Sequence, residues 1–245
     1  MGSPVKTYQT EMYENFGFFA TWLPGDPIEV GDVGVFEEGR FRREARLSDF
    51  QIPCQVEVAD NASDVQFTSR NGVQLSTSAG ASAGAVGELR MSIQFTGDGA
   101  FLFHASGLKV HRLGNRPEVT AAVLGLYERK RWKKEWLIVE AVHTAARTTV
   151  LISEDKAAKV ELAAKSELPV PVPVASLATP DAKVQVTASE GKVFQSIGAS
   201  NQHPLYACLR VKDPFFGPVD LAPFRGPDDT GRFLERPSIS ELLGP

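Results

Sequence analysis

Strict alternation of apolar and polar residues from Glu88 to Phe95 is the pattern that most restricts how this chain can fold. Leu89, Met91, Ile93 and Phe95 alternate with Glu88, Arg90, Ser92 and Gln94. Successive side chains of a β-strand point to opposite faces of the sheet, so this segment predicts a strand with one apolar and one polar face. Such two-faced strands are typical of antiparallel sheets built from hairpins.

Further strands are predicted on both sides of this segment, most of them as hairpins around turn residues. The predicted hairpins join residues 28–36 to 40–47, Val56 and Val58 to Val65 and Phe67, residues 88–95 to 101–105 around Gly97–Gly99, and residues 183–188 to 192–197 around Ser189–Gly191. The other predicted strands are residues 136–142 and 148–153, joined around Ala145–Ala146 and central in the sheet, and residues 205–211. Residues 159–164 fit a further strand, although their composition also suits a helix.

Two helices are predicted from apolar spacing and end signals. Residues 7–19 carry Tyr8, Met12 and Phe16 at helical spacing, with an end near Gly17. A second helix starts at Asn115, which we expect to cap it in a capping box with Glu118, and its apolar face is Val119, Ala122, Val123, Leu126 and Tyr127. The predicted fold class is α+β: a twisted, mainly antiparallel sheet of hairpins with two or three packed helices.

Composition divides the chain near Lys212. Residues 1–212 are predicted to form a single α+β domain. Residues 213–245 hold six prolines, four glycines and six acidic residues against three arginines, which predicts a wrapped or mobile tail and not a core element. Within the domain, the small-residue run at 76–87 is expected to pack closely or stay mobile, and the prolines of 168–174 favour polyproline II or an edge strand.

The densest charge follows the second predicted helix. Five of the six residues Arg129, Lys130, Arg131, Trp132, Lys133 and Lys134 are basic, and Trp136 follows. One interpretation is a solvated helix end with both tryptophans anchored in the core. Another is that these six residues contact anionic lipid headgroups, since clustered cations and tryptophan both favour that surface. Contact with nucleic acid or protein is a third, although the net charge of −4 argues against nucleic acid as a main partner.

Catalytic and metal-binding patterns are weak. Gly80–Gly84 matches the G-x-S-x-G pattern of serine hydrolases around Ser82, but a strand is expected after it where that motif needs a helix. The histidines lack the spacing of metal ligands: His104, His111, His143 and His203. Cys54 and Cys208 are expected to be partly buried thiols. We therefore expect no enzyme activity, cofactor or metal, and, with no apolar run of about 18 residues, a soluble cytoplasmic chain.

Across residues 8–212 the layout resembles the bacterial gasdermins and the pore-forming N-terminal domain of gasdermins generally. The resemblance rests on Phe16-Gly17-Phe18, Leu23-Pro24, the hairpin opening at Ile28-Glu29-Val30, the Gly-rich stretch before amphipathic strands, and the segment HPLYACLRV from His203 to Val211. The short C-terminal remainder resembles that family's inhibitory tail.

The resemblance implies an autoinhibited chain, cytoplasmic when inactive, that a protease cuts near its C-terminus. It would then oligomerise with itself on an anionic membrane and refold hairpins into a pore. Bacterial gasdermins carry a lipidated cysteine near the N-terminus, whereas the first cysteine here is Cys54, so lipidation at Cys54 or Cys208 is not implied. The alternative that the residues leave open is a non-enzymatic interaction module whose tail docks a partner.

Overall fold

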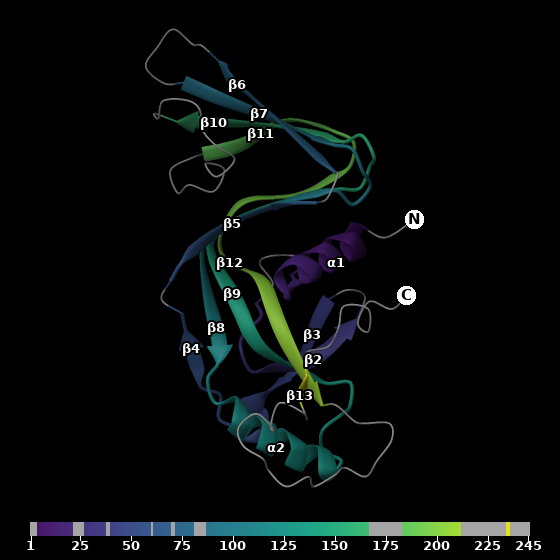
Figure 1. Ribbon diagram of the computed structural model, residues 1–245, viewed down its shortest axis with the longest axis vertical. Coiled ribbons are helices and arrows are strands. Elements are labelled where there is room, and N and C mark those ends of the chain that lie inside the picture. Colours follow the sequence, from purple (N-terminus) through teal and green to yellow (C-terminus); the bar gives the residue numbers. More distant parts are fainter. Residues whose placement is uncertain are drawn as a thin grey trace.

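The computed structural model describes residues 4–21, 27–37, 40–59, 61–69, 72–80, 87–166, 183–211 and 234–235. They form two antiparallel sheets and two α-helices, as the sequence predicts for an α+β fold (Figure 1). Most of the nine-stranded sheet follows the order β1-β12-β9-β2-β3, with β8 also on β9, β4 and β5 on β8, and β13 on β12. The four-stranded sheet has the order β11-β10-β7-β6.

The elements have the following bounds: α1 Pro4–Phe16, β1 Phe19–Ala20, β2 Asp32–Glu37, β3 Arg40–Arg46, a 3-10 turn Leu47–Phe50, β4 Val56–Val58, β5 Ser63–Thr68, β6 Val73–Gly80, β7 Gly87–Phe95, β8 Phe101–Leu113, α2 Arg116–Glu128, β9 Leu137–Ser153, β10 Lys159–Ser166, β11 Lys183–Glu190, β12 Val193–Val211 and β13 Leu234–Glu235.

Three long strands, β8, β9 and β12, form the middle of the molecule, with α2 at one end and the four-stranded sheet at the other (Figure 1). β9 is 17 residues long and β12 is 19, and both run without interruption through the places where breaks are predicted. At Ala145–Ala146, β9 continues as a strand because Ala145 pairs with Gln202 on β12 and the flanking residues Thr144 and Arg147 pair with β8. At His203–Pro204, the ladder absorbs the proline through a shift of register between Gln202 and Leu205. The predicted central position of β9 is confirmed.

Both helices form where their apolar spacing predicts. α1 buries Tyr8 and Met12 completely and ends at Gly17, whose φ of +69° and bond from its N–H to the Tyr13 carbonyl (2.7 Å) form a left-handed cap. α2 buries Val119, Val123 and Leu126. These residues build two core clusters, one under α1 with Phe101 and Phe103, and one under α2 with Val33 and Ile138.

The predicted capping box at Asn115 is wrong. Asn115 stands at the N-cap position, but its side chain makes no cap hydrogen bond. Its Oδ1 accepts from the Gln55 N–H (2.9 Å) and its Nδ2 donates to the Pro53 carbonyl (3.0 Å). The side chain therefore ties the start of α2 to the segment before β4, because those backbone groups compete successfully for it.

Only one of the four predicted hairpins closes as expected, that of β2 with β3. β4 and β5 both pair with β8 instead of with each other, and β11 and β12 pair with β10 and β9. β7 does not pair with β8, because β6 and β10 already occupy both of its edges. The small-residue run is also partly strand, since β6 extends to Gly80. Other predictions fall on segments outside the described residues: 22–26, 81–86, 168–174 and most of 213–245.

The mispredicted turns are crossings between the two sheets. After β7, Gly99 adopts a φ of +77° and its N–H donates to the Ser153 carbonyl (2.9 Å), while the Ser153 N–H donates to the Ala100 carbonyl (2.8 Å). Between β11 and β12, the Lys192 carbonyl accepts from Glu154 (2.8 Å). These bonds tie neighbouring crossings together. At each crossing the chain passes from one sheet into the other.

Candidate functional site

The basic turn, defined as Arg129–Lys134, leaves α2 through a left-handed residue. Lys130 has a φ of +57°, its N–H donates to the Tyr127 carbonyl (2.9 Å), and the Arg131 N–H donates to the Leu126 carbonyl (2.9 Å). This pair of bonds is a Schellman motif, with lysine at the position where glycine is usual. The helix itself ends at Glu128, and the Arg129 Nε caps the Gly125 carbonyl (2.7 Å).

Aromatic packing fixes the position of this turn. The Trp132 ring is 4% exposed, and its centroid lies 5.3 Å from that of Phe50 and 5.2 Å from that of Trp136. The Trp132 Nε1 has no hydrogen-bond partner among the described residues. Trp136, half-buried, packs on the same cluster of core residues under α2. The prediction that both tryptophans anchor the turn in the core is confirmed.

Glu44 on β3 contacts Trp136 and Lys133 and links them to the edge of the sheet. Its Oε2 accepts a hydrogen bond from Trp136 Nε1 (2.7 Å) and lies 3.4 Å from Lys133 Nζ, which is 5.1 Å from the centre of the Trp136 ring. The bond from Trp136 and the charges of Lys133 and Arg42 lower the pKa of the Glu44 carboxyl. The sequence contains no signal for this contact, because Glu44 lies 92 residues before Trp136.

The charged side chains of the turn face solvent. Arg129, Lys130, Arg131, Lys133 and Lys134 are all exposed, whereas Trp132 is not. Of the six residues predicted to contact lipid, five thus lie on an accessible surface and Trp132 positions them. A compact cationic surface of this kind attracts anionic groups, and the attraction weakens as salt is added.

The four-stranded sheet contains two adjacent β-hairpins, β6–β7 and β10–β11, joined by pairing of β7 with β10 along the whole of β10. Gly80 is opposite Glu88 and Lys183 is opposite Lys165, so the strand ends that lead to the hairpin connections lie together at one end of the sheet. Met91, Ile93 and Phe95 are buried while Arg90 and Gln94 are exposed, which confirms the predicted alternation for this part of β7.

Apolar rows continue across the pairing onto the two outer strands. Leu75 is in register with Ile93, which is in register with Val160. In the next row, Met91 is followed by Leu162 and then by Val186. The outermost members are the most exposed, Leu75 at 36% and Val186 at 38%. The sheet therefore carries an apolar face whose outer strands are open to solvent.

The tail contributes one described contact, the short strand β13. Leu234 pairs with Val211 and Glu235 pairs with Arg210 on β12. On the other edge of β12, Arg210 pairs with Leu137, the first residue after Trp136. The C-terminal segment is thus bound two strands away from the end of the basic turn.

The remaining candidates are Ser82, the histidines and the two cysteines. Ser82 lies outside the described residues, and the described part of the chain brings no three His, Cys, Asp or Glu side chains together as a metal site. Cys208 is buried, which raises the pKa of its thiol. Residue Cys54 is exposed as a whole, but its thiol is partly buried, and this burial and the charge of Asp32 raise its pKa.

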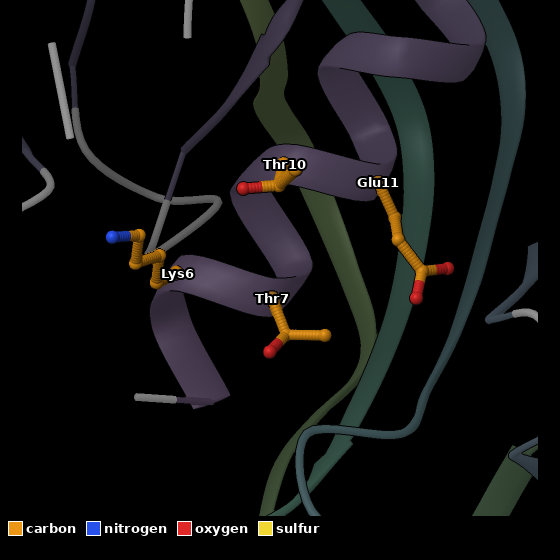
Figure 2. A pocket seen from close by; sticks show the side chains of 4 residues that line it. All are labelled: Lys6, Thr7, Thr10 and Glu11. Atoms are coloured by element: carbon orange, nitrogen blue, oxygen red, sulfur yellow. The ribbon is translucent and has the colours of Figure 1, made fainter. Parts of the chain in front are cut away.

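A hollow of about 370 Å³ lies along the first turns of α1, lined by Lys6, Thr7, Thr10 and Glu11 (Figure 2). These half-buried polar side chains all come from one helix. The described lining of the hollow holds no histidine or cysteine. Within the described part of the chain, no helix has the length and apolar content needed to cross a membrane.

Comparison with known proteins gives a likeness to a solved structure. No protein-family model and no curated protein matches the chain. Among solved structures, the chain is similar to the cryo-EM structure of the gasdermin A3 membrane pore, at 11% sequence identity and a TM-score of 0.30, covering 95% of this chain and 94% of that one. The likeness is a loose one of overall layout, and nothing about the activity of this chain follows from it.

Proposed function

We propose that this chain permeabilises membranes, without catalysing a reaction, and that its C-terminal segment, residues 213–245, keeps it inactive until a protease removes that segment. The observation that supports this most is the pair of adjacent hairpins in the four-stranded sheet. Their strands are eight or nine residues long with alternating faces. That is close to the roughly 9–11 residues that a strand needs to cross a bilayer.

Insertion of these hairpins requires more than one copy of the chain. β6 and β11 form the two edges of the sheet, and no described strand pairs with either outer edge. Backbone N–H and C=O groups left unpaired in lipid cost several kcal/mol each. Strands from neighbouring copies would satisfy them, so the inserted form is a self-oligomer.

The basic turn is the proposed first contact with the membrane. Its five exposed cations, Arg129, Lys130, Arg131, Lys133 and Lys134, would bind anionic headgroups, and the buried Trp132 would hold them in place. In the resting protein, located in the cytoplasm, the acidic C-terminal segment anchored by β13 would lie near this turn and offset its charge. Removal of the segment would then direct the chain to the membrane.

Cleavage of the folded full-length chain tests the proposal. A recognition sequence for a site-specific protease is inserted after Lys212, and dye release from phosphatidylserine-containing vesicles is measured with and without the protease. We expect release at micromolar protein only after cleavage. If cutting leaves the vesicles intact, the chain is not a permeabilising protein of this kind. If the chain were instead an interaction module, cleavage would make it lose a partner captured through residues 213–245. Against that alternative, β13 shows part of that segment already bound to its own chain.

Neutralising two cations of the turn should weaken membrane binding of the cleaved protein. Lys130→Asn suits the left-handed backbone, and Arg131→Gln removes an exposed charge. Each basic residue near an anionic surface contributes about 1 kcal/mol, so we expect roughly 10- to 30-fold weaker binding at low salt. Vesicle co-sedimentation measures this. The control, Lys109→Gln with Lys156→Gln, changes net charge equally at exposed sites elsewhere; an equal loss there would mean that total charge, not the turn, decides binding.

A further inference from the structure

The N-terminal arm, defined as residues 4–21 with α1 and β1, is attached to the central sheet by a short ladder. Only Phe19 and Ala20 pair with β12, opposite Tyr206 and Leu205. Beyond β1, the Thr21 N–H donates to the Pro204 carbonyl (3.0 Å), and the Thr21 hydroxyl donates to the His203 carbonyl (2.8 Å). In Figure 1 the helix of the arm lies alongside the long central strands. Its attachment therefore depends on few backbone bonds and on side-chain packing.

Three of the four histidines lie where this arm is attached, on three adjacent strands. His143 on β9 is in register with Leu205, and its ring meets the Phe18 ring edge-on at 4.3 Å between centroids. The His143 Nε2 is buried and has no hydrogen-bond partner among the described residues. His203 on β12 supplies the carbonyl that binds Thr21, and His111 on β8 bonds Thr144 through Nε2 (3.0 Å).

The surroundings of His143 make its protonation unfavourable. Burial is the main cause, and electrostatic repulsion by Arg112 and His111 on β8 adds to it; together they lower the pKa of His143 to about 4. On the neighbouring strand, burial lowers the pKa of His203, His111 lowers it further and Glu29 raises it. Glu29 thus faces His203, whereas no described carboxylate offsets a charge on His143.

We propose that His143 and Phe18 form an acid-sensitive latch, which holds the N-terminal arm on the sheet while the imidazole is neutral and releases it when the imidazole is protonated. A buried imidazolium donates from both ring nitrogens and needs hydrogen-bond acceptors and hydration, and the described residues around His143 Nε2 offer no acceptor. Attraction between an imidazolium and the Phe18 ring would offset only part of that cost, since Arg112 and His111 repel the new charge. Release of the arm would uncover the faces of Tyr8 and Met12, which are fully buried.

The direction of the pH effect follows from proton binding in the two states. Above the ordinary histidine pKa of about 6.5, His143 is neutral whether the arm is attached or released. As the pH falls from about 6.5 towards about 4, only the released state binds the proton, so attachment loses stability across that window. At pH 5.5 the equilibrium constant for release should be on the order of 10-fold larger than at pH 7.5.

Hydrogen exchange in the intact, uncleaved chain tests the latch. Protection of the amides of residues 4–21, corrected for intrinsic exchange, is compared at pH 7.5 and 5.5. We expect about a 10-fold loss of protection in the arm while β9 and β12 keep theirs. His143→Gln should abolish most of the pH dependence. His104→Gln is the matched control, because His104 is also buried, with its pKa lowered chiefly by burial, but faces Asp64 and not the arm.

Two results would overturn the latch. One is an unchanged pH dependence of arm protection in His143→Gln, and the other is a loss of protection in β9 and β12 equal to that in the arm. Should His143→Gln fail to fold, NMR titration of the His143 imidazole in the unaltered chain decides the matter. A pKa near 6.5 would contradict the latch, and a pKa below about 5 supports it. Neither measurement involves a membrane, so the outcome does not depend on the permeabilising function proposed above.

Discussion

Replacing Leu75 and Val186 together by lysine is expected to abolish membrane permeabilisation by the cleaved chain and to leave its fold intact. Both residues extend the apolar rows of the four-stranded sheet onto its outer strands, and they are 36% and 38% exposed. A lysine at either place keeps its ammonium in water in the resting protein. In an inserted strand the same side chain would face lipid.

The cost of that placement sets the size of the effect. A lysine on the lipid face of a membrane strand costs about 2–4 kcal/mol at the bilayer midplane. Two such residues in every copy would lower the population of inserted oligomers by about a thousandfold or more. Dye release from anionic vesicles measures the loss, and thermal unfolding of the uncut chain should shift by only a few degrees.

Neighbouring glutamines provide the matched control. Gln74 precedes Leu75 on β6, and Gln185 precedes Val186 on β11, so both point to the opposite face and both are exposed. Gln74→Lys with Gln185→Lys adds the same two charges to the same strands. We expect this control to retain most of the dye release. Equal inactivation by both pairs would mean that the faces of the sheet are not distinguished by a membrane, and insertion of these strands would be excluded.

Sequence patterns predicted most strands of this chain but not their partners. The alternation around Met91 and Ile93 identifies a strand because the signal lies within the strand itself. Pairing β7 with β8 assumed that a Gly-rich turn closes a hairpin. Gly99 instead bonds to Ser153 at the end of β9, a contact 54 residues away in sequence that no local pattern encodes. The breaks predicted at Ala145–Ala146 in β9 and before Leu205 in β12 were wrong for the same reason. Pairing between β9 and β12 on both sides of these positions keeps each strand continuous.

The basic turn was predictable in part. Charge density identified the cationic surface, and the positions of Trp132 within the basic run and Trp136 just after it identified the anchor. The anchoring partners were not predictable, because Glu44 lies on β3 and Phe50 in the 3-10 turn that follows it. Both residues are distant in sequence from the tryptophans that they contact. The left-handed conformation of Lys130 was also unpredicted, since glycine is the usual residue there.

Trp132→Ala should destabilise the protein by about 3–5 kcal/mol, the usual cost of removing a buried tryptophan. For a chain of this size that corresponds to roughly a 10 °C fall in the unfolding midpoint, measured by circular dichroism. Trp132→Phe is the matched control: it keeps a ring against Phe50 and removes an indole N–H that lacks a described partner. We expect it to cost less than about 1.5 kcal/mol.

The membrane assay then separates anchoring from charge. Below its unfolding midpoint, cleaved Trp132→Ala keeps every cation of the turn but no longer holds them in one arrangement, so we expect weaker vesicle binding with an unchanged dependence on salt. Lys130→Asn with Arg131→Gln should instead reduce that salt dependence, because it removes charge and leaves the Trp132 anchor in place. If Trp132→Ala costs less than about 1 kcal/mol, or if cleaved Trp132→Ala binds vesicles as well as the unaltered chain, the arrangement of the cations around Trp132 is not what the membrane recognises.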